Sequence, residues 1–155
     1  MESEKNKSNK TQFGFSIHWE GLYFNVEGDK KIRKAFFSKE PFFSYKTSAL
    51  TEKIEKYFKG EKVNFKLKFD LELPRFTKKV LEKVLEIPYG KTRNYGEIAE
   101  ELQTSPRAIG QALAKNPIVV LIPCHRVISK SGIGGYSYGV RIKKALLRLE
   151  GVDIF

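Results

Sequence analysis

Hydrophobic and polar residues alternate through much of the first half of the chain, a period that is typical of half-buried strands. The alternation predicts strands over residues 13–19, 22–26 and 32–37. Apolar residues then recur at helical spacing over 47–59, so we expect a helix there. Alternation returns over 63–73 and predicts one further strand.

The second half of the chain has mainly helical periodicity. It predicts helices over 74–86 and 94–102, a third that opens at Ser105, and a last one over 140–150. Ser105 followed by proline is a typical helix start. Two short helices separated by a few residues predict a helix-turn-helix around Ser105.

Two stretches between these helices have a different character. The unbroken apolar run 118–122 predicts a buried strand. The segment 129–139 contains four glycines, which suit either a flexible surface hairpin or a wing whose backbone approaches a ligand closely. Together with the helix-turn-helix, the strand and the wing predict a winged-helix-like domain.

Pro74 divides the chain into two parts. We expect a disordered, charged tail over residues 1–10, an N-terminal α/β domain over 11–74 and a C-terminal domain over 75–155. The predicted fold class is therefore α+β, built from two small domains.

The composition narrows the cellular setting. No apolar stretch reaches the roughly 18 to 20 residues that a membrane span requires, and the polar N-terminus predicts no signal peptide. A single cysteine forms neither an internal disulfide nor a multi-cysteine zinc site. We therefore expect a cytoplasmic protein, in a reducing compartment and without a membrane partner.

The formal net charge is +11, which is large for 155 residues. Residues 1–74 carry 15 Lys and Arg against 11 Asp and Glu, whereas residues 75–155 carry 14 against 7. The excess predicts a polyanionic partner, with nucleic acid ahead of an acidic membrane surface, and it is larger in the C-terminal half. A solubilising or thermophile-type lysine-rich surface is the alternative.

The second helix of the predicted helix-turn-helix carries small side chains at Ala108, Gly110, Ala112 and Ala114. They leave a smooth face on which a groove of DNA can approach the backbone, and Arg107 in the first turn could reach the bases. Glycine inside a helix costs roughly 1 kcal/mol relative to alanine, so its presence indicates a use. Tight helix–helix packing explains the same residues equally well.

Candidate chemistry concentrates in the sequence Cys124-His125-Arg126. A cysteine thiol has an ordinary pKa of roughly 8.5 and is a poor nucleophile until a base or a cation raises its thiolate fraction. His125 and Arg126 are candidates for that activation. Neighbouring side chains on a strand point to opposite faces, so a contact between Cys124 and His125 requires irregular backbone or a bridging water. An inert core cysteine is the alternative.

The segment Pro123–Val127 resembles the signature of the O6-alkylguanine-DNA alkyltransferases, a family of DNA repair proteins. The resemblance extends in order and spacing from Phe76 to Gly151, and it includes Tyr95, Pro106–Gly110, Asn116-Pro117, Ile122–Val127, Gly135–Ser137, Leu146-Leu147 and Glu150-Gly151. By position alone, the N-terminal half corresponds to the variable N-terminal domain of the family. The resemblance implies an RNase H-like fold for that half.

The resemblance implies direct-reversal repair without a cofactor. Cys124 would take the alkyl group from O6 of guanine, and less readily from O4 of thymine, and would keep it irreversibly, so that each molecule reacts once as a methylated-DNA–protein-cysteine methyltransferase. His125 would act as the base through a water, and Glu150 would orient His125. Tyr95 would contact the damaged base and offer it a proton or a hydrogen bond.

The resemblance also implies a double-stranded DNA partner, bound through its minor groove with weak sequence preference, and a damaged base that is flipped out. Arg107 would fill the vacated place in the base stack. The implied DNA-binding set is Ser105, Arg107, Ala108, Gly110, Ala112 and Asn116. The implied pocket set is Val127, Tyr136, Ser137 and Lys143, with Asn116 and Arg126 as structural hinges.

Two departures from the family pattern matter. Some members hold a structural zinc in the N-terminal domain, but His18 is the only other candidate ligand here, so we expect no metal. A related group has tryptophan in place of the cysteine and only binds lesions, and Cys124 argues against that group. Two alternatives stay open: a non-catalytic winged-helix protein that binds DNA or senses lesions, and a Cys–His hydrolase. We expect a monomer.

Overall fold

Three of the predicted strands form an antiparallel sheet in the order β1-β2-β3. They are β1 (Phe13–Trp19), β2 (Leu22–Gly28) and β3 (Ile32–Ser38). The computed structural model describes residues 13–153, so the predicted tail over 1–10 lies outside the described residues. The predicted strands over 13–19, 22–26 and 32–37 are confirmed.

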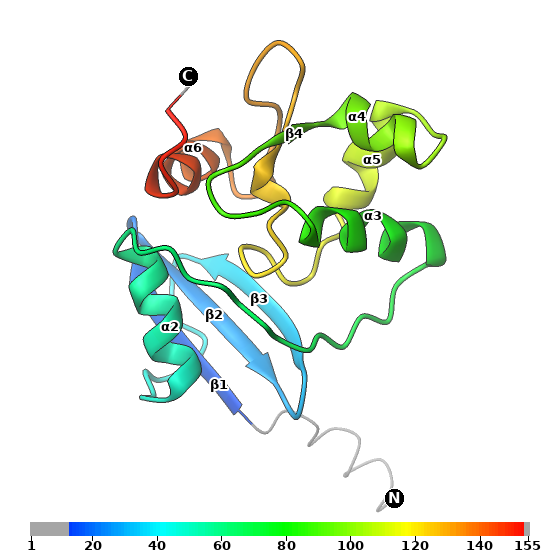
Figure 1. Ribbon diagram of the computed structural model, residues 1–155. Coiled ribbons are helices and arrows are strands. Elements are labelled where there is room, and N and C mark those ends of the chain that lie inside the picture. Colours follow the sequence, from blue (N-terminus) through cyan, green and yellow to red (C-terminus); the bar gives the residue numbers. More distant parts are fainter. Residues whose placement is uncertain (1–12, 154–155) are drawn as a thin grey trace, which may run out of the picture.

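The predicted helix over 47–59 is also confirmed, as α2 (Ala49–Phe58). The Ser48 hydroxyl accepts a hydrogen bond from the amide of Thr51 and so satisfies a free donor of the first turn. Figure 1 shows α2 lying across one face of the sheet. Its buried side chains include Ile54 and Tyr57, which join the main hydrophobic core.

The C-terminal part contains four helices that sequence periodicity predicts. They are α3 (Arg75–Leu85), α4 (Tyr95–Glu101), α5 (Pro106–Leu113) and α6 (Val140–Leu149). Asn94 and Glu97 form a reciprocal capping box at the start of α4, and the Ser105 hydroxyl caps α5. The caps fix where α4 and α5 begin, and the two helices pack against each other (Figure 1).

The predicted strand over 63–73 is wrong. The segment is extended, but only Phe69 forms a bridge, parallel to Ile32 of β3. The chain here runs from the end of α2 past β3 to α3, so it meets the sheet edge at one pairing only (Figure 1). The alternation of its side chains therefore reflects half-burial against the core rather than sheet pairing.

The predicted buried strand over 118–122 is also wrong. The amide of Ala35 donates to the carbonyl of Pro117 at 3.0 Å, and the amide of Val119 donates to the carbonyl of Ala35 at 2.9 Å. Val120 then takes a left-handed conformation with φ 71°, which ends the pairing. All five apolar residues are buried because the segment runs between the sheet and the helices, so burial alone explains the apolar run.

Two short elements follow this turn. Residues Cys124–Arg126 form a single 3-10 turn, η1, and Val127–Ile128 form β5, which pairs in parallel with β4 (Arg93–Asn94). The glycine-rich segment 129–139 is mainly an irregular loop, with one bridge between Ser129 and Gly132. The observed fold class is α+β, as expected, and one hydrophobic core runs through both parts of the chain.

Candidate active site

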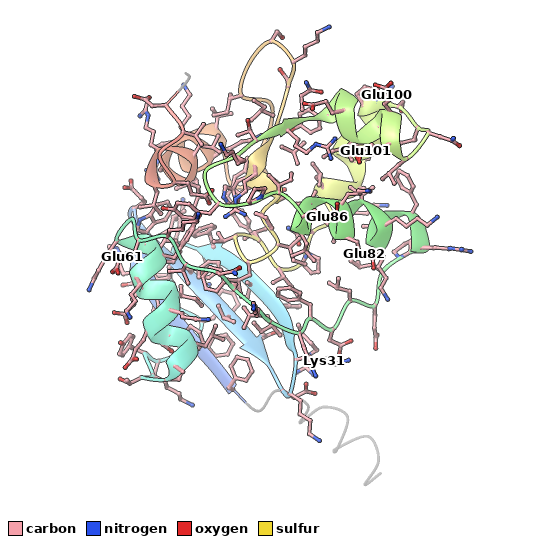
Figure 2. All side chains as sticks on the ribbon, viewed as in Figure 1. Lys31, Glu61, Glu82, Glu86, Glu100 and Glu101 are labelled. Carbon is pink, nitrogen blue, oxygen red and sulfur yellow. The ribbon has the colours of Figure 1, made fainter. Side chains whose placement is uncertain are left out.

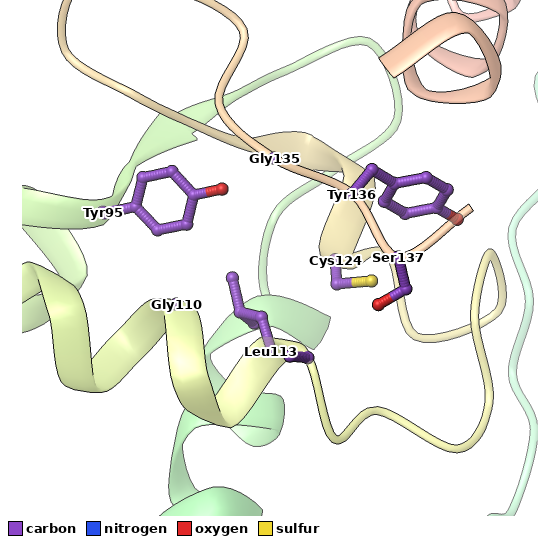
Figure 3. A pocket seen from close by; sticks show the side chains of 8 residues that line it. Tyr95, Gly110, Leu113, Cys124, Gly135, Tyr136 and Ser137 are labelled. Carbon is purple, nitrogen blue, oxygen red and sulfur yellow. The ribbon is translucent and has the colours of Figure 1, made fainter. Parts of the chain in front are cut away.

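Cys124 lies at the wall of a cavity of about 410 Å³. The cavity is within the size range of small-molecule sites, large enough for a purine base. Figure 3 shows Tyr95 and Tyr136 on either side of it, and the complete lining is Tyr95, Gly110, Leu113, Ala114, Cys124, Gly135, Tyr136 and Ser137. Only 7% of Cys124 is exposed, so the cavity provides the access to its thiol.

Burial raises the pKa of the Cys124 thiol, because an anionic sulfur is poorly solvated there. The side chain of Asn116 and the charge of Lys143 act in the opposite direction. The balance keeps the resting thiol protonated near neutral pH. A nucleophilic role for Cys124 therefore requires a base.

His125 is fully buried beside Cys124, and its Nε2 lies 2.7 Å from Oε2 of Glu150. Burial lowers the pKa of His125, so the imidazole is neutral. An ionised carboxylate only accepts hydrogen bonds, so Nε2 carries the proton and donates it. Nδ1 is then an unprotonated acceptor, and it has no hydrogen-bond partner among the described residues.

The Glu150 carboxylate follows α6 and accepts five hydrogen bonds. Oε2 accepts from Nε2 of His125, from the Tyr57 hydroxyl at 2.5 Å and from Nη2 of Arg126 at 3.1 Å. Oε1 accepts from Nε of Arg126 at 2.8 Å and from the amide of Gly90 at 3.1 Å. Burial alone would raise the pKa of Glu150, but His125 and Arg126 hold it at about 2, and the group is ionised.

Arg126 connects the Glu150 carboxylate to the backbone of Ile87. Its Nη1 donates to the carbonyl of Ile87 at 2.7 Å, and its other nitrogens reach Glu150. Both partners belong to the C-terminal part, so these contacts hold the site loop and do not tie the two parts together. Tyr57, on α2, makes that link, and no sequence pattern distinguishes it from an ordinary core aromatic.

Lys143 and Val127 lie behind the cavity and not on its lining. The buried ammonium of Lys143 donates to the carbonyl of Val127 at 2.6 Å and to that of Gly135 at 2.9 Å. Burial lowers the pKa of Lys143 to about 8. Its nitrogen also lies 5.7 Å from the centre of the Tyr95 ring. Lys143 thus joins α6, β5 and the glycine-rich loop.

Two further predicted residues have clear positions. The hydroxyl of Tyr136 is buried beside the cavity and has no partner within residues 13–153. The Asn116 side chain donates to the carbonyl of Ile122 at 2.9 Å and accepts from the amide of Ile118 at 2.9 Å. Asn116 therefore fixes the segment that leads to Cys124. These two bonds use the amide oxygen of Asn116 and one of its amide hydrogens.

The exposed side of α5 carries Arg107, and Ala108 and Gly110 are half-buried there. A Cβ atom on Gly110 would meet nothing within 4 Å, so helix packing does not require glycine at this position. Ala112 is only 3% exposed, and it packs into the core with Ile109. The assignment of Ala112 to the smooth face is therefore wrong, because helical geometry turns it inward.

The charge of the sequence stretch that carries α5 is strongly one-sided. Residues 102–149 contain eight Lys and Arg and no Asp or Glu. Acidic side chains of the C-terminal part gather instead on α3 and α4, where Figure 2 shows Glu82, Glu86, Glu100 and Glu101. The stretch that carries α5, Cys124 and the glycine-rich loop is thus basic, which suits a polyanion.

The described residues form neither a cluster of metal ligands nor a membrane-spanning helix. In the part of the chain that the structure describes, no three His, Cys, Asp or Glu side chains gather to hold a metal ion. His18 is exposed on β1, with its ring against Tyr23. No helix between residues 13 and 153 is long and apolar enough to cross a membrane.

Comparisons with known proteins agree on one family. Residues 75–152 match the family described as "6-O-methylguanine DNA methyltransferase, DNA binding domain". A methylated-DNA–protein-cysteine methyltransferase of Archaeoglobus fulgidus is 49% identical over 146 residues, 89% of this chain and 99% of the relative. One from Saccharolobus solfataricus is 51% identical over 110 residues, 69% of this chain and 73% of the relative.

Two solved structures resemble the fold. The crystal structure of Mycobacterium tuberculosis OGT in complex with DNA has a TM-score of 0.78 and 33% identity, and the match covers 88% of this chain and 91% of that one. The O6-methylguanine-DNA methyltransferase of Pyrococcus kodakaraensis has a TM-score of 0.72 and 27% identity, with 90% and 100% covered.

Proposed function

The chain belongs to the O6-methylguanine DNA methyltransferase family, and from that premise we propose that Cys124 is its alkyl acceptor. The protein carries out direct-reversal repair of DNA by alkyl transfer to a cysteine. One observation carries the assignment of the cysteine: the only thiol of the chain opens onto a cavity of purine size, beside a neutral histidine that a carboxylate orients.

The reaction begins with removal of the thiol proton. His125 Nδ1 takes the proton of Cys124 through one water, and Glu150 stabilises the resulting imidazolium. The thiolate attacks the alkyl carbon on O6 of guanine, so a sulfur–carbon bond forms as the carbon–oxygen bond breaks. The oxygen keeps the electron pair, and the base takes up a proton to become guanine. The thioether is stable, and each molecule acts once.

The cavity walls hold the damaged base. The Tyr95 hydroxyl points into the cavity and offers a hydrogen bond or a proton to the leaving base. The Ser137 hydroxyl also faces the cavity and serves the oxygen of the base, while the ring of Tyr136 forms a wall. Lys143 keeps the wall rigid by binding the carbonyls of Val127 and Gly135.

The helix pair α4–α5 is the proposed DNA reader, a helix-turn-helix of winged-helix-like kind. We place the face around Arg107 and Gly110 in the minor groove, where the code is degenerate and suits repair in any sequence. Arg107 replaces the flipped base in the stack. Residues 11–74 form an RNase H-like domain in this proposal and 75–155 the DNA-binding domain, and the protein acts as a cytoplasmic monomer.

The alkyl acceptor is tested by mass. After incubation with duplex DNA that contains O6-methylguanine, the wild-type protein should gain one methyl group in place of a hydrogen, on the peptide that contains Cys124. Cys124→Ala should gain none and should still bind the DNA. Transfer by Cys124→Ala, or persistence of the methyl group on DNA that the wild-type protein binds, contradicts the proposal and favours a lesion sensor.

The role of Arg107 is tested by comparing duplex DNA with the free alkylated base. Flipping a base costs a few kcal/mol, so we expect Arg107→Ala to slow transfer from duplex DNA by about tenfold or more. Transfer from the free base should be unchanged, since nothing is flipped. Lys115→Ala removes an exposed charge close to the end of α5 and is the control. Equal effects of both variants on duplex repair would remove the stacking role.

A further inference from the structure

The hydroxyl of Tyr57 lies in the polar cluster behind Cys124, although Tyr57 belongs to α2 in the N-terminal part. Tyr57 is 1% exposed, and its ring packs against Phe58, Phe65 and Tyr89. Its hydroxyl donates to Oε2 of Glu150 at 2.5 Å and lies 3.4 Å from Nε2 of His125. Oε2 is also the acceptor of His125, so the two side chains share one oxygen.

We propose that Tyr57 is a positioning residue that sets the basicity of His125 by sharing the Glu150 carboxylate with it. The inference rests on the proposed role of His125 as the base. It assigns to the N-terminal part a direct influence on the chemistry of the site.

The negative charge on Oε2 of Glu150 is shared among the donors that bind it. Each hydrogen bond that an anionic oxygen accepts leaves less negative potential for its other partners. Without the Tyr57 hydroxyl, Oε2 would interact more strongly with the Nε2 proton and would stabilise the imidazolium form of His125 more. Tyr57 therefore keeps the imidazole less basic, and so neutral and ready to accept a proton at Nδ1.

The charged groups around His125 shift its pKa in different directions. Glu150, after α6, favours its protonated form, whereas the cations Arg126 of η1 and Lys143 of α6 disfavour it. Burial disfavours it most of all. Glu150 is thus the one group in this set that raises the basicity of His125, and a donor that weakens Glu150 has a direct effect on the base.

A second tyrosine, Tyr89, is partly buried where the two parts of the chain meet and provides a matched control. The Tyr89 hydroxyl donates to the carbonyls of Gly60 at 3.3 Å and Leu149 at 3.2 Å. It joins the two parts of the chain as Tyr57 does, but its hydrogen bonds go to backbone carbonyls and not to Glu150. Tyr89→Phe therefore reports on the loss of a bridging hydroxyl alone.

The test uses the fact that the chain has two histidines, His18 and His125. The full-length protein is labelled with ¹⁵N-histidine, and both rings are titrated by NMR in the wild type, Tyr57→Phe and Tyr89→Phe. We expect the pKa of His125 in Tyr57→Phe to lie about one unit higher, the size expected for one hydrogen bond to a charged group. His18, exposed on β1, is the internal reference and should not shift. An unchanged His125, or the same shift in Tyr89→Phe, overturns the inference.

A variant of opposite sign covers the case in which Tyr57→Phe fails to fold. Incorporation of 3-fluorotyrosine at position 57 keeps the ring and makes the hydroxyl a stronger donor, so the pKa of His125 should fall. A rise or no change contradicts the proposal. The acid limb of the single-turnover transfer rate should move in the same direction as the His125 titration in each variant.

The outcomes separate this inference from the proposed function. If the wild-type protein transfers no alkyl group to Cys124, the proposed function fails, and the NMR titration still measures the coupling of Tyr57 to His125. If transfer occurs and the His125 titration ignores Tyr57, only the present inference fails.

Discussion

Glu150 illustrates how single residues determine the electrostatics of this site. A buried carboxylate is ordinarily protonated, and the C-terminal end of a helix disfavours a negative charge. Here five donors surround the carboxylate, and two of them come from Arg126, so the ionised form is the stable one. The same ionised carboxylate sets the tautomer of His125, which leaves Nδ1 as an unprotonated acceptor without a partner among the described residues.

This arrangement predicts a defined loss of stability in acid. The pKa of Glu150 is about 2 in the folded protein against 4.5 ordinarily, so its contribution is complete above pH 4.5 and is lost as the pH falls towards 2. The shift corresponds to about 3 kcal/mol of unfolding free energy. Glu150→Gln should lose a similar amount at pH 7 and show a flatter acid profile in urea unfolding.

The control is Glu100→Gln, an exposed glutamate on α4. It should leave both the stability and its pH dependence unchanged. A Glu150→Gln variant as stable as the wild type at pH 7 would contradict the account of the buried cluster.

At the scale of elements, α5 combines a packed side with an open side. Ile109, Ala112 and Leu113 are buried in the core. The other side carries Arg107, and Gly110 and Ala114 there line the cavity that opens beside Cys124. Because the open side contacts nothing within the protein at Gly110, its small residues are best explained by a partner outside the chain.

Gly110→Ala separates stability from function on this helix. The added methyl group meets open space and alanine is the better helix former, so the variant should be more stable by about 1 kcal/mol. The same methyl group projects from the proposed DNA-facing side, so duplex affinity and transfer rate should fall. Chemical unfolding and a binding titration measure the two effects. A variant that is more stable and binds DNA as well as the wild type would show that this face does not approach DNA closely.

At the scale of the whole molecule, one hydrophobic core spans the sheet, the helices and Cys124 itself. The segment that leads to Cys124 pairs with Ala35 of β3, and Tyr57 of α2 bonds to Glu150. The sulfur therefore lies in a core that both parts of the chain share.

Alkylation should consequently destabilise the folded protein. Only 7% of Cys124 is exposed, so atoms added to its sulfur press on the residues packed around it at the cavity wall, and such crowding typically costs about 1–3 kcal/mol. The melting temperature should fall by several degrees after reaction with methylated DNA, once the DNA is removed. Cys124→Ala after the same treatment is the control and should not change. An equal or higher melting temperature of the alkylated protein would show that the site accommodates the group without strain.

The sequence alone determined the features that depend on neighbouring residues. The helix start at Ser105 and the helices over 47–59, 74–86, 94–102 and 140–150 follow from local hydrogen bonding and periodicity. The family motif likewise marks Cys124 and His125 as candidates. Such features lie within a few residues of chain, where pattern and structure correspond directly.

Only the tertiary structure decided what depends on distant contacts. The alternation over 63–73 and the apolar run over 118–122 both suggest strands, but each segment forms only isolated bridges. The first is half-buried against the core, and the second is buried between the sheet and the helices. Tyr57 and Glu150 are 93 residues apart, and the sequence around neither residue predicts their hydrogen bond. An aromatic residue on the apolar side of a helix can fill the core or bond to a buried carboxylate. The outcome depends on which element packs against it, and local sequence does not encode that choice.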